Sequence, residues 1–267
     1  MTRFDSKNNV EAGSNYVLMP DNRRVASQRL HYLKKKMIKD EAFGKEYTAF
    51  MEKLFTMGYA RRVPVEISAT ERSWWIPHHG VYHPVKKKFR TVFDCSAKSD
   101  GISLNSKLIQ GPDPSNSLVG VLARFRIGKI AFMADIETMY YQVRIPEKHS
   151  KFLRFLWWEN GNFDTKPIEC EMLVHPFGAV SSKSCVIFAL HQAAFDNKET
   201  YGVEAVETLL HDFYADDLLK SLDKEEAVIQ LVRNIDGMCA AGGFNLTKFI
   251  CSSENVMDSI PLLKEEE

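Results

Sequence analysis

Two adjacent aspartates, Asp216 and Asp217, are the residues whose types and spacing most directly suggest chemistry. They lie between apolar side chains in residues 211–219, a run without Lys or Arg. The pattern predicts a strand, a tight turn and a second strand, with both aspartates at or just past the tip. Two like charges held side by side favour a bound divalent cation, whereas the alternative is a solvated Asp-Asp turn.

Asp135 offers a third carboxylate. It lies near the end of residues 130–136, a short apolar run that is typical of a buried strand. Burying an unpaired carboxylate is costly, so such a residue is rarely present for packing alone. Asp135 and the aspartate pair have the right types for a site in which three carboxylates hold two metal ions.

A basic segment could bind the phosphates that such a site would serve. Residues 85–94 predict a hairpin with three lysines at its tip, the last being Lys88, and Arg90 just beyond them. A mobile cationic hairpin suits a triphosphate or a nucleic-acid backbone. The alternative is a run of solvated lysines.

A turn at Phe177 and Gly178 precedes a predicted helix. Glycine lets the backbone approach a ligand closely, so this turn could line a binding site. The alternative is an ordinary connection between a strand and a helix.

Three histidines in an aromatic, proline-broken stretch invite a zinc hypothesis. His78, His79 and His83 precede Cys95, but their spacing fits no structural zinc pattern well. The prolines at 77 and 84 favour an extended strand instead. The sequence leaves the roles of these histidines open.

Length, composition and charge indicate what kind of protein the chain is. The chain has 267 residues, enough for one large domain or two intertwined subdomains, and its five scattered cysteines indicate free thiols in a reducing compartment. Without a signal peptide or an apolar run long enough to cross a bilayer, we expect a soluble, intracellular, cytoplasmic protein with no membrane partner. Residues 1–130 carry 23 Lys and Arg against 12 Asp and Glu, and residues 131–267 carry 12 against 23. This split could give a polyanion a basic surface and cations an acidic site, or it could only draw the two halves together.

Hydrophobic periodicity and turn residues predict the remaining elements. We expect helices over 22–36, 39–57, 117–125, 180–195 and 224–240. We expect further strands over 151–158, 168–174 and 244–249. Residues 1–20 are predicted to be a poorly ordered lead-in, and residues 256–267 a solvated tail.

Taken together, these stretches resemble a reverse transcriptase, more closely the polymerase of BEL/Pao-type long-terminal-repeat retrotransposons. The resemblance covers residues 75–255, and the order and spacing of several short motifs carry it. These motifs are FRTVFDCSAK at 89–98, SLN at 103–105, ADIE at 134–137, PFG at 176–178, YADDLL at 214–219 and GGFNLTK at 242–248.

The resemblance implies an α+β fold, the right-hand polymerase, in which an antiparallel palm sheet is backed by helices. Fingers are then expected over 21–109 and 145–175, and palm over 110–144 and 176–255. The thumb, connection and ribonuclease H regions have no counterpart in the sequence, so the chain is expected to be a polyprotein fragment that grips its substrate weakly. Virus-like particles are a further expected location.

The resemblance also implies the site. Asp135, Asp216 and Asp217, with the backbone carbonyl of Ile136, would hold two Mg²⁺ ions, with Mn²⁺ as a substitute. Lys248 would lie near the departing pyrophosphate, and Tyr140 would exclude a 2′-hydroxyl. Nucleotide contacts are expected from the following residues: Arg90, Lys88, Phe177 and Gly178.

The implied activity is RNA-directed DNA polymerisation. The partners would be an RNA or DNA template with its primer, and deoxynucleoside triphosphates. Ala215 replaces a residue that is often bulkier in the family, and Ser184 stands where a proline is common. The alternatives are a catalytically silent remnant that binds nucleic acid and a two-metal nuclease.

Overall fold

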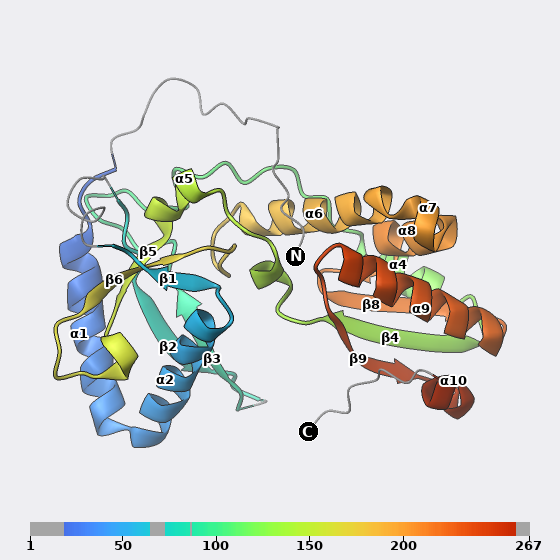
Figure 1. Cartoon of the computed structure of the whole chain (residues 1–267), viewed down its shortest axis with the longest axis horizontal. Helices are drawn as coiled ribbons and strands as arrows, with labels where there is room; N and C mark the ends of the chain where they lie inside the picture. Colours follow the sequence, from blue (N-terminus) through green and yellow to red (C-terminus); the bar gives the residue numbers. More distant parts are fainter. Residues whose placement is uncertain (1–18, 65–72, 86, 260–267) are drawn as a thin grey trace. The chain divides into compact units, whose positions relative to one another are not determined.

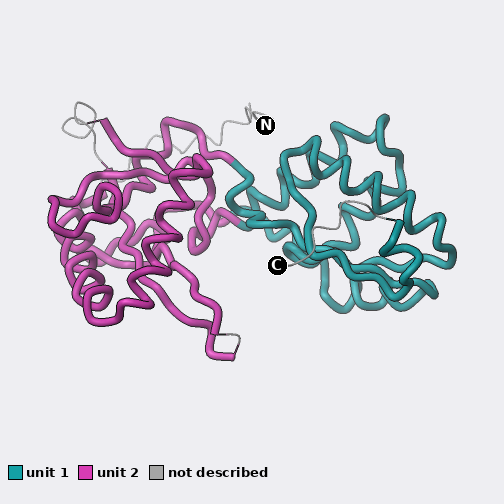
Figure 2. The backbone as a smooth tube through the Cα atoms, turned by 60° about the horizontal axis from the view of Figure 1, so that its bottom comes forward, with its two compact units in different colours: residues 1–4, 111–143, 183–267 teal, residues 5–110, 144–182 magenta. Residues whose placement is uncertain are grey.

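The computed structural model describes residues 19–64, 73–85 and 87–259. Contacts divide the chain into two compact units (Figure 2). The first contains residues 111–143 and the described residues from 183 on, and the second contains those up to 110 and 144–182. The expected changes from fingers to palm after residue 109 and back to fingers after residue 144 lie within one residue of the first two unit boundaries. Residues 176–182 were expected in the palm but fall in the second unit, with the expected fingers. Most of the predicted lead-in lies outside the described residues.

The first unit is built on a four-stranded antiparallel sheet with the strand order β7-β8-β4-β9 (Figure 1). Its strands are β4 (Ile130–Ile136), β7 (Phe213–Tyr214), β8 (Asp217–Leu222) and β9 (Leu246–Cys251). Alternate residues of β4 point to opposite faces, so Phe132, Ala134 and Ile136 enter the core while Met133 and Asp135 face the other way. The predicted buried strand at 130–136 is confirmed.

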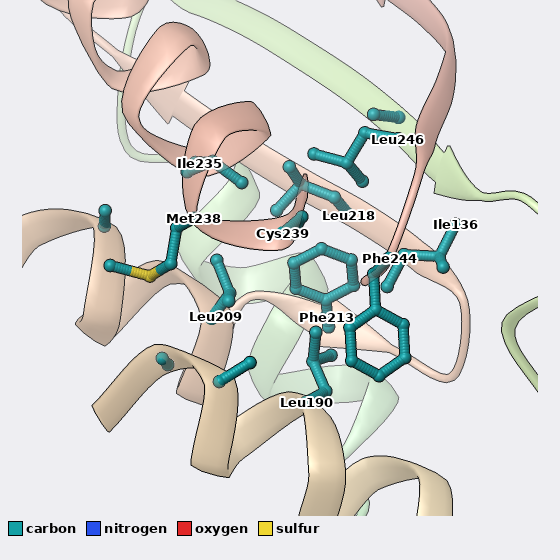
Figure 3. Packing of buried hydrophobic residues seen from close by; sticks show 14 of the residues in the cluster. Ile136, Leu190, Leu209, Phe213, Leu218, Ile235, Met238, Cys239, Phe244 and Leu246 are labelled. Carbon is teal, nitrogen blue, oxygen red and sulfur yellow. The ribbon is translucent and has the colours of Figure 1, made fainter. Parts of the chain in front are cut away.

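Helices cover one face of this sheet and enclose the core (Figure 3). Phe213, Leu218 and Phe244 from the sheet side are packed with apolar residues of α6, α8 and α9. The helices of this unit are α4 (Leu118–Phe125), α6 (Ser182–Asp196), α7 (Lys198–Tyr201), α8 (Val203–His211), α9 (Glu225–Ala241) and α10 (Glu254–Ser259), and η1 (Met139–Gln142) is a 3₁₀ turn. Ser182, the first residue of α6, belongs to the second unit.

α9 shows why the local sequence folds as it does. Five apolar residues recur at three- and four-residue spacings and are all buried: Val228, Leu231, Val232, Ile235 and Met238. Burying one such side chain contributes about 1.5–3 kcal/mol relative to leaving it exposed. Gly242 follows the last helical residue, and Gly243 has a positive φ of 82°, which turns the chain toward β9.

Among its described residues, the second unit contains two small antiparallel sheets and two long helices. The sheets are β1-β6-β5 and the hairpin β2-β3. The elements are α1 (Arg23–Lys39), α2 (Glu41–Thr56), β1 (Ala60–Arg62), β2 (His78–Tyr82), β3 (Phe89–Phe93), α5 (Glu147–Ser150), η2 (Lys151–Leu153), β5 (Arg154–Trp157), η3 (Glu159–Gly161) and β6 (Ile168–Met172). The predicted basic hairpin is confirmed, with β2 as its first strand.

Several predicted boundaries were wrong. The first helix runs to Lys39 instead of residue 36, and only Asp40 separates it from α2, whose Phe43 amide donates to the Asp40 side chain over 3.1 Å. Lys151–Leu153, predicted as strand, is a 3₁₀ turn. The last strand begins at Leu246 and not at residue 244.

The C-terminal tail was also predicted to begin too early. Val256 is fully buried inside α10, which docks on α9 and β9. Residues 260–267 of the predicted tail lie outside the described residues. Over the described ranges, no helix combines the length and the apolar character that crossing a membrane would require.

Candidate metal and nucleotide site

Asp135 and Asp217 are direct cross-strand neighbours on the first unit's sheet. β4 and β8 run antiparallel with Asp135 opposite Asp217, Ala134 opposite Leu218 and Met133 opposite Leu219. Side chains opposite each other across a ladder share one face of the sheet. Asp135 and Asp217 therefore project from the face opposite the core that contains Ala134 and Leu218.

Asp216 lies in the two-residue turn between β7 and β8. Tyr214 pairs with Asp217, so Ala215 and Asp216 form the turn, and Ala215 has a positive φ of 54°. The amide of Ile136 donates to the Asp216 carbonyl over 2.9 Å. This bond ties the turn to the end of β4, so all three aspartates lie at one end of the sheet. The strand–turn–strand prediction is confirmed for residues 213–219, but His211 ends α8 and Asp212 lies between α8 and β7.

Lys248 reaches the same end from β9. Its Nζ lies 3.6 Å from Asp135 Oδ1. The pairing of β4 with β9 shifts register between Met133 and Asp135, and Lys248 lies in the matching part of β9 with a φ of 54°. A bulge of this kind re-aims a side chain. The Thr247 hydroxyl, beside it, donates to the Asp135 carbonyl over 3.2 Å.

The electrostatics of Asp135 show that these charges interact. Its partial burial raises the pKa of the carboxyl above the usual value, and the charges of Asp216 and Asp217 raise it further. The ammonium of Lys248 acts in the opposite direction and lowers it. The three carboxylates and one cation thus form a single electrostatic site.

Asp135 and Asp217 offer only part of a metal-ligand set, and their metal role stays a prediction. Across the parts of the chain that the structure describes, no group of three or more His, Cys, Asp or Glu side chains forms a ready-made metal cage. Mg²⁺ is usually bound by one or two carboxylates plus waters and substrate phosphates, and rarely by a cage made only of protein. Asp135 and Asp217 supply adjacent carboxylates on a rigid ladder, which suits that mode. A metal role for the Ile136 carbonyl stays a prediction.

Tyr140 lies just after β4, in η1. Its ring packs partly against the core, and burial raises the pKa of its phenol, with a further upward contribution from the charge of Asp216 and an opposing one from Lys183. Tyr140 therefore lies within electrostatic range of the aspartates. Its predicted sugar-selecting role stays a prediction.

The other predicted nucleotide contacts belong to the second unit. Arg90 on β3 and Lys88 just before it are exposed. Phe177 is 48% exposed, and Gly178 has a φ of 105°. That these residues serve the same site as the aspartates stays a prediction.

Asn105 joins three of the sequence motifs within the second unit. Its Nδ2 donates to the Gly178 carbonyl over 2.8 Å and to the Ser96 hydroxyl over 3.1 Å. Its Oδ1 accepts from the Val180 amide over 3.0 Å. The side chain thus fixes the Phe177–Gly178 turn against the segment after β3. We predicted no role for Asn105, although the SLN motif contains it.

The histidine stretch is not a zinc site within the described residues. His78 is buried, with Nδ1 2.5 Å from the Tyr47 hydroxyl and Nε2 2.9 Å from the Leu156 carbonyl. Burial lowers its pKa to about 4. His78 is a neutral core histidine that bridges α2 and β5. The sequence around His78 does not indicate these two partners, which lie 31 and 78 residues away along the chain.

Comparison with known proteins supports the fold. No protein-family model and no curated protein matches the sequence. Several solved structures do, among them the protease–reverse transcriptase of prototype foamy virus, with a TM-score of 0.56, 15% identity, and coverage of 78% of this chain and 24% of that chain. The foamy viral protein in complex with an RNA/DNA hybrid gives a TM-score of 0.55 at 13% identity over 78% of this chain and 23% of that chain. Its complex with double-stranded DNA gives 0.52 at 14% identity, covering 72% and 28%.

These similarities establish a mixed α+β fold of the reverse-transcriptase kind. The chain spans about a quarter of the length of the foamy virus chains it matches. At such low identity the likeness concerns the fold, and the chemistry has to be argued from the site.

Proposed function

We propose that the chain is an RNA-directed DNA polymerase domain that adds deoxynucleotides to a primer 3′-hydroxyl. The observation that carries this proposal is the register that sets Asp135 opposite Asp217, with Asp216 in the adjoining turn. The likeness to foamy virus reverse transcriptases supports it, because those proteins have been seen with double-stranded DNA and with an RNA/DNA hybrid. In this proposal the first unit is the palm and the second the fingers.

Asp135, Asp216 and Asp217 would hold two Mg²⁺ ions, or Mn²⁺ in their place. When bound, such ions lower the pKa of the attacking hydroxyl and neutralise charge on the triphosphate. The ladder between β4 and β8 fixes two of these carboxylates without a flexible loop between them. This rigidity suits a reaction that depends on holding its reactants in line.

Lys248 would supply a positive charge beside the proposed metal ligands. Its ammonium lies 3.6 Å from Asp135 and 47% of its side chain is exposed, so it is free to reach a ligand phosphate. Charge stabilisation on the departing pyrophosphate is the role that its position supports. Tyr140 would lie beneath the sugar, and Arg90 and Lys88 would grip the triphosphate.

The finer assignments belong to the same proposal. In this proposal the domain is of the BEL/Pao retrotransposon type, as the resemblance of its motifs implies. Phe177 and Gly178, held by Asn105, would line the nucleotide or template side. The natural partners would be a primed RNA or DNA template and deoxynucleoside triphosphates.

Primer extension tests the proposal. The whole chain, given a primed RNA template, Mg²⁺ and deoxynucleoside triphosphates, is expected to lengthen the primer. The double variant Asp216→Asn, Asp217→Asn should lose extension, while Asp223→Asn, an exposed carboxylate at the other end of β8, should retain it.

The same assay separates the alternatives. Extension that survives the double substitution contradicts the assigned site. Primer–template binding without incorporation favours a silent nucleic-acid-binding remnant. Mg²⁺-dependent cleavage without nucleotides indicates a two-metal nuclease.

A further inference from the structure

A fourth aspartate near the catalytic hairpin is not used by the proposed chemistry. Asp212 follows α8 and directly precedes β7, the first strand of the hairpin that carries Asp216 and Asp217. Its side chain is only 2% exposed. A carboxylate so deeply buried is stable only if it is paired and hydrogen-bonded.

Two cations from distant parts of the first unit pair with Asp212. Arg124 Nε, in the last turn of α4, lies 2.7 Å from Asp212 Oδ1, and Lys220 Nζ, on β8, lies 2.6 Å from Asp212 Oδ2. The Arg124 guanidinium also donates to the carbonyl of the neighbouring His211. The backbone carbonyl of Asp212 accepts from the Leu219 amide over 3.0 Å. Asp212 therefore links α4 to the start of the hairpin and to its second strand.

The first strand of the hairpin has few backbone partners, whereas the second strand, β8, is paired with β4 along its length. β7 has two residues, pairs with β8 alone, and lies at the edge of the sheet. The turn that follows contains Ala215 at a positive φ, a conformation that is strained for a residue other than glycine. A short edge strand with a strained turn is expected to open locally unless side chains hold it.

Asn116, just before α4, also binds the chain on both sides of Asp212. Its Nδ2 donates to the carbonyls of Leu210 and Phe213, each over 2.9 Å. These carbonyls lie on either side of Asp212 along the chain. Asn116 and Arg124 thus hold the base of the hairpin at four successive residues, 210–213.

We propose that Asp212 is a positioning residue that holds the hairpin in the register that sets Asp217 opposite Asp135. The part of this inference that concerns metal binding rests on the proposed function, whereas the part that concerns the hairpin's position does not. Asp212 need not touch substrate or metal.

Amide hydrogen exchange on the whole chain tests the position of the hairpin. In Asp212→Asn, exchange at residues 213–219 should rise roughly tenfold or more, while exchange across α9 stays as in the wild type. Arg124→Gln removes one partner and leaves the carboxylate, so it should give a smaller rise at the same residues. Asp223→Asn makes the same charge change at an exposed site and should change neither region.

An unchanged hairpin in both Asp212→Asn and Arg124→Gln would overturn the inference. So would a rise that is equal in the hairpin and in α9, because that result describes general destabilisation. If Asp212→Asn does not fold, Arg124→Gln decides between these outcomes.

Mn²⁺ binding, followed by electron paramagnetic resonance without nucleotide or template, separates this inference from the proposed function. Weaker binding by roughly 10–100-fold in Asp212→Asn supports both, since support residues around metal ligands have effects of that size. If the wild type binds Mn²⁺ and Asp212→Asn binds it equally well, only the part of the inference that concerns metal binding is overturned. A wild type that binds no Mn²⁺ contradicts the proposed function, and hydrogen exchange then still decides the role of Asp212.

Discussion

Asp135 stands directly opposite Asp217 across the β4–β8 ladder, on the face of the sheet opposite the core. Like charges in that position repel each other and weaken the ladder. The chain keeps them there beside a third aspartate and Lys248. Such an arrangement stores an unfavourable interaction that a bound cation would relieve, and the first two predictions follow from it.

Asp135→Asn should stabilise the chain at neutral pH while it removes the proposed activity. The folded-state pKa of Asp135 is raised, first by burial and then by Asp216 and Asp217, so the folded chain binds this proton more tightly than the unfolded chain does. The charged form therefore destabilises the fold, and stability falls as pH rises through the folded pKa. We expect the variant to melt higher at pH 7, by about 2–4 °C for each kcal/mol relieved.

A thermal scan at pH 7 measures this change, and a second scan below the pKa of an ordinary aspartate provides the control. The gain should shrink at the lower pH, because Asp135 is then protonated in both states. A variant that melts lower than the wild type at pH 7 contradicts the prediction.

Lys248→Met should raise the pKa of Asp135 further. The ammonium is the group that opposes burial and the neighbouring carboxylates, and methionine keeps the side chain's length without its charge. A ¹³C NMR titration of the Asp135 carboxyl measures the effect. Lys224→Met, which changes an exposed lysine beyond the far end of β8, is the matched control and should leave the titration where it is. An unshifted Asp135 in Lys248→Met would show that the two groups are not coupled.

Local patterns predicted the parts of the site that are close in sequence. The apolar run before Asp135 and the alternation around Asp216 define β4 and the hairpin, because each pattern depends on its own few residues. The partners that fix these elements could not be predicted in the same way. Asp212 meets Arg124 across 88 positions and Asn105 meets Gly178 across 73, and no periodicity links residues so far apart.

Short connecting elements were also missed, for a related reason. Lys151–Leu153 carries the apolar character of a strand, yet its backbone closes into a 3₁₀ turn before β5. Val203–His211 forms α8 and was not predicted, although three of its apolar residues are buried against the sheet. In both segments tertiary packing decides the conformation, and local propensity is a weak guide to it.

The second unit should lose stability as pH falls below about 6.5. Burial lowers the folded-state pKa of His78, and likewise that of His175, to about 4, so the unfolded chain takes up these protons first. Stability from each histidine is complete above the unfolded pKa and is lost as pH falls toward the folded one. The cost is on the order of 3 kcal/mol for each histidine by pH 4.

Denaturant unfolding between pH 7.5 and pH 4, followed by the tryptophans of this unit, measures that loss. A ring-proton NMR titration of His78 identifies its source. The ring should stay neutral to well below pH 6. Titration of His78 near pH 6.5 in the folded chain would contradict the prediction.

Gly178→Ala should destabilise the second unit by more than Gly101→Ala does. Both glycines have a positive φ, 105° and 77°, but a Cβ on Gly178 would lie 2.7 Å from the Phe93 carbonyl, whereas one on Gly101 would meet nothing within 4 Å. Gly101→Ala therefore measures conformational strain alone, about 1 kcal/mol. We expect Gly178→Ala to cost about 1–3 kcal/mol more, because backbone must move. Urea unfolding of the two variants compares them, and equal costs would show that the Phe93 contact is not tight.

The central claim is that Asp135 and Asp217 share a metal ion. Anomalous diffraction from crystals of the whole chain soaked with Mn²⁺ and a deoxynucleoside triphosphate tests it most directly. We predict a manganese peak within about 2.0–2.3 Å of a carboxylate oxygen of each aspartate, with phosphate oxygens completing the shell. Crystals that bind the nucleotide but place no manganese between Asp135 and Asp217 would contradict it.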